Sequence, residues 1–155
     1  MRHRILIVGL FVLLLSVPAG AQAIGLYASW WELGDLNDGF GFGARQRIFG
    51  VPLLSVEGRA GWIDLEDAEA TLIPLEANAL LDIGLFYGGA GAGYYLFDSD
   101  LADETAWFGL AGVSVGTGGV GVFAEAKYTA LETKRNEAEV SAKGLALNAG
   151  VRLGW

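Results

Sequence analysis

The chain has 155 residues and a formal net charge of −8 at pH 7, from 18 acidic and 10 basic residues. This length fits one domain with a single core, and the acidic balance argues against a nucleic-acid partner. There is no cysteine, and the one histidine is His3. Residues 24–155 therefore cannot form a disulfide, a catalytic site that uses histidine or cysteine, or an imidazole or thiolate metal site.

The beginning of the chain has the pattern of a secretory signal peptide. Basic residues at 2–4 precede an apolar run over 5–17, and the small-residue sequence Ala-Gln-Ala ends at Ala23. The run is shorter than the about 20 apolar residues that a membrane-spanning helix requires. We therefore expect residues 1–23 to direct export through a Sec-type pathway and to be removed. The remaining domain, 24–155, has 8 basic and 18 acidic residues, a net charge of −10.

Apolar residues recur at every second position after Ala23, which predicts β-strands rather than helices. We place eight strands at 24–33, 40–49, 53–64, 70–82, 84–97, 106–116, 120–131 and 139–155. Each has about ten or more residues, enough for a tilted strand to cross a bilayer. Long, mostly acidic links alternate with tight turns along the chain. This regularity favours an all-β, eight-stranded antiparallel up-and-down transmembrane barrel over a generic β-meander.

One face of the predicted strands is apolar, and the other carries charged residues and glycines. The charged residues are Arg45, Arg47, Glu57, Arg59, Glu76, Asp82, Glu125, Lys127 and Arg152. The glycines are Gly41, Gly43, Gly61, Gly89, Gly91 and Gly93. Five positive and four negative charges nearly balance, as a confined interior requires because isolated buried ions are costly. We therefore predict that this face points inward as a polar network, with the glycines making room for arginine and glutamate side chains.

Aromatic residues on the apolar face gather near the ends of the predicted strands. Trp30, Phe40, Trp62, Tyr94, Trp107 and Tyr128 fall toward the long links, whereas Phe86 and Trp155 fall toward the tight turns. Aromatic girdles at both rims are typical of barrels that cross two membrane interfaces. Aromatic residues that only filled a core would not cluster at strand ends in this way.

The last eight residues, NAGVRLGW, resemble the C-terminal recognition signal of bacterial outer-membrane barrels. Asn148, Gly150, Leu153 and Trp155 match its polar, glycine, hydrophobic and aromatic positions. Together with the signal peptide and the eight strands, they make residues 24–155 similar in plan to the small outer-membrane barrels, OmpX-like or like the barrel domain of OmpA. The resemblance implies insertion by the barrel-assembly machinery and a last strand that pairs with the first. It also implies a Gram-negative outer membrane, with lipid and lipopolysaccharide around a monomer.

Three functional hypotheses are compatible with such a barrel. The first is a non-enzymatic outer-membrane protein with a plugged polar interior and a structural or surface-interaction role, because eight strands leave an interior that side chains fill. The second is a narrow ion or proton pore. The third is a soluble, lipocalin-like periplasmic ligand carrier, in which the charged face would point outward.

Catalysis and metal binding have weaker support in the sequence. A carboxylate-based enzyme would use Glu57, Glu76 or Glu125, but the arginines and lysine on the same face favour simple ion pairs. Asp98, Asp100 and Asp103 supply oxygen ligands of the kind that Ca²⁺ and Mg²⁺ prefer. Their segment lacks the glycine and terminal glutamate of a dedicated calcium loop. We therefore expect a solvated acidic loop there, no resident metal and no cofactor.

Overall fold

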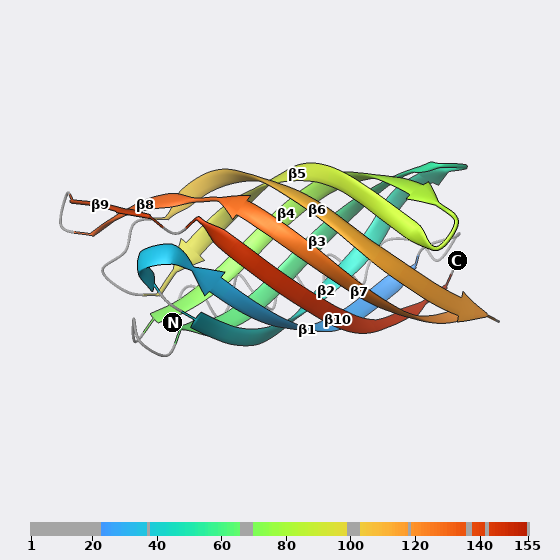
Figure 1. The fold of residues 1–155 in the computed structure, drawn as a ribbon, viewed down its shortest axis with the longest axis horizontal. Helices are drawn as coiled ribbons and strands as arrows, with labels where there is room; N and C mark the ends of the chain where they lie inside the picture. Colours follow the sequence, from blue (N-terminus) through green and yellow to red (C-terminus); the bar gives the residue numbers. More distant parts are fainter. Residues whose placement is uncertain are drawn as a thin grey trace.

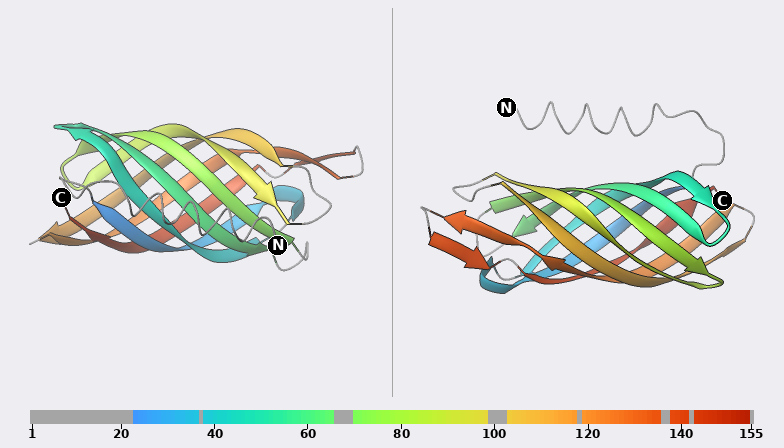
Figure 2. Two further views of the ribbon diagram at one scale, coloured as in Figure 1. Left: turned by 180° about the vertical axis from the view of Figure 1, so that it is seen from behind. Right: turned by 90° about the horizontal axis from the view of Figure 1, so that it is seen from above.

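The computed structural model describes residues 23–36, 38–65, 70–98, 103–117, 119–135, 138–141 and 143–154. Eight antiparallel strands close into one barrel in the order β1-β10-β7-β6-β5-β4-β3-β2, tilted to its long axis (Figure 1). Their bounds are β1 Ile24–Leu33, β2 Asp38–Val51, β3 Leu54–Leu65, β4 Ala70–Ile83, β5 Phe86–Phe97, β6 Glu104–Thr117, β7 Val120–Ala130 and β10 Gly144–Leu153. Figure 2 shows the same tilt from two further sides. The predicted fold class, an eight-stranded antiparallel up-and-down barrel, is confirmed.

The barrel closes between its first and last strands. β1 pairs with β10 from Ile24 opposite Leu153 to Leu33 opposite Gly144. This pairing leaves neither strand with an open edge, which a structure that spans a bilayer requires. Among the described residues, no helix is long and apolar enough to cross a membrane.

The last barrel strand begins at Gly144 rather than at residue 139, so that predicted boundary is wrong. Residues Glu132–Arg135 and Ala138–Ser141 instead form a separate two-stranded hairpin, β8 and β9. The reason is that the neighbouring wall ends here, since β1 stops at Leu33 and β7 stops at Ala130. Residues before 144 have no wall strand to pair with, and they pair with each other. The other predicted strand bounds differ from the observed ones by two residues or fewer.

The two ends of the barrel differ, as the alternating link lengths predict. At one end, short turns join β2 to β3, β4 to β5 and β6 to β7. Gly84 and Gly119 adopt positive φ angles of 64° and 83° in two of these turns, and Leu53 adopts 71° in the third. At the other end, a 3-10 turn, η1 Gly34–Leu36, and the β8–β9 hairpin extend beyond the wall (Figure 1). We call these the tight-turn end and the long-link end.

The ladder between β3 and β4 is interrupted in the middle of the wall. Ala60 pairs with Leu75 and Ile63 pairs with Leu72, but the two residues between them on each strand are not paired. Pro74 lies in this gap, and its missing N–H removes one ladder hydrogen bond. A Cβ at Gly61 would lie 3.1 Å from the Pro74 ring. The glycine at position 61 thus gives the proline ring room inside the barrel.

Candidate functional site

The centre of the barrel interior is built around the carboxylate of Glu125 on β7. Arg59 on β3 donates hydrogen bonds to both carboxylate oxygens, one of them 3.1 Å long. Arg45 Nη1 donates at 3.2 Å, the Tyr87 hydroxyl at 2.8 Å and Asn148 Nδ2 at 2.9 Å. Four strands of the wall therefore supply donors to one buried carboxylate. Charge-assisted and bidentate bonds of this kind are the strong ones in proteins.

Glu57 makes the central group of charges neutral. Its carboxylate lies 3.4 Å from Arg59 Nη2 and 3.7 Å from Arg45 Nη1. Two arginines therefore share two glutamates, and the side chains of all four are at most 2% exposed. The Arg45 guanidinium also stacks on the Phe123 ring, 3.6 Å from its centroid. Pairing and stacking together compensate for the removal of these charges from water.

A second buried ion pair joins Lys127 on β7 to Glu76 on β4. The Tyr95 hydroxyl donates to the same Glu76 oxygen at 2.8 Å. Lys127 Nζ lies 4.2 Å from the Trp31 ring centroid and 5.1 Å from that of Phe108. The lysine is thus held by one carboxylate and two aromatic faces, an arrangement that suits a desolvated ammonium group.

The remaining predicted interior charges lie at the tight-turn end. Asp82 on β4 accepts a hydrogen bond of 2.9 Å from Ser55 and lies 3.7 Å from Arg47 Nη2. The side chains of Arg47 and Asp82 are 21% and 33% exposed, so this end is more open to solvent than the centre. Arg152 on β10 is buried, and the charges of Glu57 and Asp82 attract it. The structure thus places all nine predicted charges on the inner side of the barrel.

The long-link end of the interior is apolar, which the sequence analysis did not predict. A cluster of buried side chains fills it, and we call it the apolar cluster: Trp31, Leu33, Leu36, Ile63, Leu65, Ala70, Leu72, Tyr95, Phe97, Ala106, Leu131 and Ala146. Most of these residues lie on the inward-facing side of a strand that carries polar inward residues nearer the centre of the barrel. On β3, for example, Ile63 and Leu65 follow Arg59 on the same side. The sequence therefore indicates the apolar cluster by a change from polar to apolar residues along the inward-facing side of a strand.

The sequence analysis also missed several uncharged members of the polar interior. Tyr87 and Tyr95 donate to Glu125 and Glu76. Ser29 donates to the Asn148 side chain and accepts a 2.6 Å hydrogen bond from Trp31 Nε1. These side chains point inward because they lie at every second position of their strands, on the same side as the charged residues.

The interior glycines serve tyrosines and backbone more than charged side chains, so their predicted role is largely wrong. A Cβ at Gly43 would lie 2.5 Å from the Tyr27 hydroxyl oxygen, whereas one at Gly93 would lie 2.9 Å from Glu76 Cγ. Gly41, Gly89 and Gly91 instead face backbone carbonyl groups of neighbouring strands. Glycine opposite an inward tyrosine leaves room for the ring to lie across the neighbouring strand. Among the six predicted positions, only Gly93 makes room for a charged side chain.

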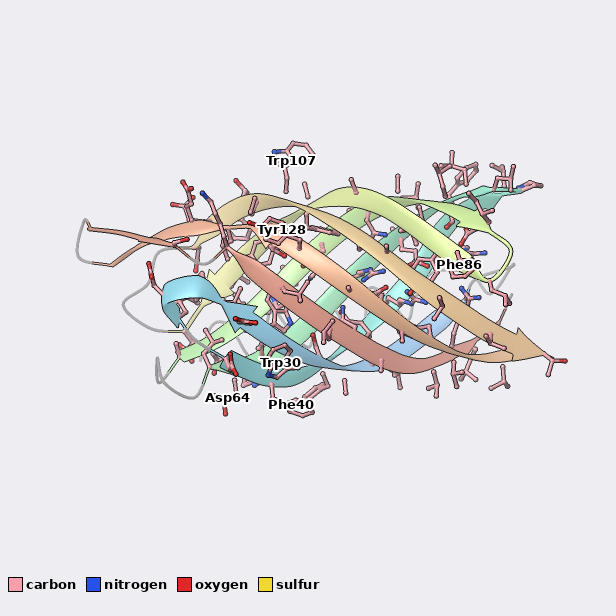
Figure 3. The ribbon with its side chains drawn as sticks, in the orientation of Figure 1. Trp30, Phe40, Asp64, Phe86, Trp107 and Tyr128 are labelled. Carbon is pink, nitrogen blue, oxygen red and sulfur yellow. The ribbon has the colours of Figure 1, made fainter. Side chains whose placement is uncertain are left out.

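The predicted interface aromatics lie on the outer surface of the wall. Trp30 pairs directly with Phe40, and both lie in the half of the barrel nearer the long links, as do Trp107 and Tyr128 (Figure 3). Tyr94 and Trp62 also belong to this half, and Trp62 is half-buried. Phe86 lies toward the tight-turn end (Figure 3) and is 65% exposed. Trp155, the predicted partner of Phe86 in the second girdle, lies outside the described residues.

Of the predicted assembly signal, Asn148, Gly150 and Leu153 lie in β10, and Trp155 is outside the described residues. Leu153 points outward and is 55% exposed, while Gly150 faces the backbone of Leu26 and Tyr27 on β1. Asn148 points inward to Glu125. That asparagine is therefore also part of the polar interior.

The long-link end shows no metal site among the described residues, where no three potential ligands gather. Asp103 Oδ1 accepts a 2.9 Å hydrogen bond from the backbone N–H of Phe97, and the N–H of Asp98 donates to Thr71. Asp100 lies outside the described residues. On the exposed rim, Lys143 lowers the pKa of Glu132 through a hydrogen bond and its charge.

Comparison with known proteins identifies the fold. No protein-family model matches the sequence, and no curated protein matches it. Neisserial surface protein A is similar in structure with a TM-score of 0.67 and 19% identity, over 90% of this chain and 100% of that one. OprG, an outer-membrane protein of Pseudomonas aeruginosa, has a TM-score of 0.61 and 15% identity, over 88% and 96% of the two chains. A de novo designed transmembrane β-barrel has a TM-score of 0.52 and 10% identity, over 90% and 100%.

These similarities define the class to which the fold belongs. At such low identities the likeness concerns the arrangement of strands, not shared functional residues. The chain has the fold of a small eight-stranded outer-membrane β-barrel. The resemblance drawn from its sequence is confirmed at this level.

Proposed function

We propose that the chain is a non-enzymatic barrel of the bacterial outer membrane whose interior does not conduct solutes and whose role is structural or surface-interacting. The observation that carries the proposal is the set of buried side chains that extends along the interior from the central ion pairs to the long-link end. Buried ion pairs centred on Glu125 and Glu76 occupy the middle, and the apolar cluster follows toward the long-link end. An interior packed in this way has no room for a hydrated solute.

Burial on the two faces supports a lipid environment over the soluble alternative. Outward Phe42, Val122 and Trp107 are 63%, 58% and 73% exposed. Surface apolar area of this extent is costly in water but favourable against hydrocarbon. A lipocalin-like carrier requires the reverse arrangement, with charged residues outside and an apolar cavity inside.

The export and assembly steps complete the proposal. Residues 1–23 act as a Sec-type signal, and the barrel-assembly machinery recognises Asn148, Gly150, Leu153 and Trp155. The tight turns then face the periplasm, and the long links face lipopolysaccharide outside the cell. The outward position of Leu153 supports this role, since a recognition segment must present an accessible side chain.

The long-link end is the part that offers a surface for interaction. The β8–β9 hairpin projects past the wall (Figure 1), and its strands pair with each other. The Ser141 N–H donates a 3.1 Å hydrogen bond to Asp35 on the loop that contains η1. A hairpin attached to a turn presents a defined rather than an unstructured surface to partners.

The carboxylates support a non-enzymatic role. Glu57, Glu76 and Glu125 each lie against a positive side chain and are buried. A general acid or base must reach a substrate proton and change its protonation state. The hydrogen-bond donors that surround these carboxylates already occupy their oxygens.

Two measurements on the refolded protein test the proposal. Electrophoresis of boiled and unboiled samples should show a heat-dependent mobility shift, because a closed barrel resists detergent until it is heated. In planar bilayers the same preparation should give no stepwise conductance above the background of protein-free membranes. Stepwise conductance in the wild type would favour the narrow-pore alternative, and a protein that stayed soluble without lipid or detergent would favour the carrier.

A further inference from the structure

The turn between β4 and β5 carries apolar side chains at positions where turns in water are usually polar. Ile83, Leu85 and Phe86 are 67%, 57% and 65% exposed, and we call these three side chains the turn patch. Gly84 adopts a φ of 64°, which lets the chain reverse within two residues. The other turn position gives leucine no conformational advantage, because turns favour glycine, proline, asparagine, aspartate and serine. The presence of Leu85 there therefore requires another reason.

Two backbone hydrogen bonds hold this turn against its neighbours. The N–H of Asp82 donates to the Leu53 carbonyl oxygen at 3.1 Å, and the N–H of Ser114 donates to the Leu85 carbonyl oxygen at 2.8 Å. The nearest charged residue in the sequence is Asp82, and its carboxylate accepts a hydrogen bond from Ser55 on the inner side of the wall. The outer side of the turn is thus fixed in position and carries no charge of its own.

The turn patch continues the outer side of the wall without a break. Leu81, the outward residue before Ile83, is 56% exposed, and Ile83 pairs with Phe86 across the turn. A transmembrane barrel presents this outer side to hydrocarbon. Apolar area that extends from the wall onto the turn is favourable in lipid and costly in water.

The wall has different heights at two of the tight turns. On β6, ten residue steps separate the interface aromatic Trp107 from Thr117 at the turn, whereas on β5 eight steps separate Tyr94 from Phe86. With a rise of about 3.3 Å per residue and a tilt of about 40°, these stretches cover about 25 Å and about 20 Å of the barrel axis. The apolar band of an outer-membrane barrel is about 25 Å tall. The β6 strand spans this band by itself, but β5 does so only together with the turn patch.

The polarity of the two turns follows their positions along the axis. Figures 1 and 2 show β6 ending further along the long axis of the barrel than the β4–β5 turn. The turn that reaches further begins with the polar Thr117, and the nearer turn contains Leu85. This difference is expected if the boundary of the hydrocarbon layer lies between the two turns.

We propose that the β4–β5 turn lies inside the membrane, at the edge of the hydrocarbon layer, and that the turn patch contacts lipid acyl chains. The β6–β7 turn, in contrast, reaches water. Lipid is the partner that this surface fits, because the turn patch is continuous with the lipid-facing wall and completes its height on β5. The inference rests on the proposed function, a barrel that spans the membrane, and adds where the membrane boundary crosses the tight-turn end.

The first test measures the depth of the turn with a spin label, which is simple to place because the chain has no cysteine. Leu85→Cys, Thr117→Cys, Leu26→Cys and Lys143→Cys are each labelled with a nitroxide and folded into dioleoylphosphatidylcholine vesicles. Electron paramagnetic resonance then compares collisions of the label with oxygen, which dissolves in hydrocarbon, and with a water-soluble nickel chelate. The oxygen-to-nickel ratio at position 85 should match that at position 26 on the outer wall. It should exceed the ratios at positions 117 and 143 several-fold.

A second test needs no label and uses bilayers of two thicknesses. Leu85→Ser should lower the urea midpoint of unfolding in dioleoylphosphatidylcholine vesicles. It should leave the midpoint unchanged in thinner dilauroylphosphatidylcholine vesicles, where the hydrocarbon boundary lies closer to the bilayer centre. Leu26→Ser should lower the midpoint in both lipids, because Leu26 lies on the outer wall, and Thr117→Ser should change it in neither.

Two results would overturn the proposal and leave the membrane-spanning barrel intact. Nickel collisions as frequent at position 85 as at position 143 would place the turn in water, where Leu85 would be open to a soluble partner. An equal effect of Leu85→Ser in both lipids would show that the contact does not depend on the position of the hydrocarbon boundary. Frequent nickel collisions at position 26 would instead contradict the membrane-spanning placement itself, and the inference would fail with it.

Discussion

Arg59 on β3 and Glu125 on β7 form a two-oxygen ion pair across the barrel, although three strands separate them in the wall. The pair therefore joins opposite sides of the structure through its interior. Both side chains are at most 1% exposed. A contact of this kind stabilises the closed barrel against changes in shape and not just the local strand.

Removal of one partner of this pair should destabilise the barrel strongly. Arg59→Ala and Glu125→Ala each leave one uncompensated charge in the buried group of two arginines and two glutamates, for which we expect a loss of about 3–5 kcal/mol in the free energy of unfolding. Urea titrations of the protein in lipid vesicles measure this quantity. Glu132→Ala, which removes an exposed ion pair with Lys143, should leave the unfolding midpoint unchanged. Wild-type stability of both interior variants would mean that these residues are not paired inside the barrel.

A double substitution tests whether Arg59 and Glu125 stabilise the barrel as a pair. Arg59→Met combined with Glu125→Leu removes both charges and leaves apolar groups of similar volume, although Arg45, Tyr87 and Asn148 then lose an acceptor. We expect the double variant to be more stable than Glu125→Ala but less stable than wild type. A double variant less stable than either single variant would show that Glu125 contributes independently of Arg59.

Much of this arrangement follows from alternation along the strands. The inward side of a strand is fixed once one of its residues is placed, so Arg45, Arg59 and Glu125 could be assigned from the sequence. Their pairing could not, because it depends on which strands face each other across the barrel. The partner of Glu125 lies 66 residues away in the chain. The predicted start of the last barrel strand, residue 139, is wrong for a related reason, because that start depends on where β1 and β7 end.

Two glycines on β6 provide a matched test of the space around the tyrosines. A Cβ at Gly112 would lie 2.6 Å from the Tyr87 ring, whereas the nearest atom to one at Gly109 would be 3.9 Å away. Gly112→Ala should therefore displace Tyr87 from Glu125 and cost about 1–3 kcal/mol of stability. Gly109→Ala should be neutral or slightly stabilising, because alanine loses less backbone entropy than glycine. The same unfolding titrations compare them, and equal effects would contradict the close fit at Gly112.

Leu53 is the one described non-glycine residue with a positive φ, at 71°. This left-handed conformation costs a residue with a side chain roughly 1–2 kcal/mol relative to glycine. Because Leu53 is also 65% exposed, Leu53→Gly should raise the free energy of unfolding by about 1 kcal/mol. Leu85→Gly is the control, since Leu85 lies in another tight turn, is similarly exposed and has no positive φ. That control should lose stability, and a gain of the same size in both would rule out backbone strain as the cause.

The apolar cluster should limit both stability and permeability at the long-link end. Leu33 and Leu72 are fully buried within it, so Leu33→Ala or Leu72→Ala should cost about 2–5 kcal/mol through the cavity each creates. Leu26 lies on the outer wall and is 54% exposed, and Leu26→Ala should cost less because lipid fills the space that the side chain leaves. A variant with both interior leucines replaced should also admit ions more readily than the wild type in planar bilayers. If Leu26→Ala were the most damaging of the three, packing against lipid and not the interior cluster would dominate the stability of this barrel.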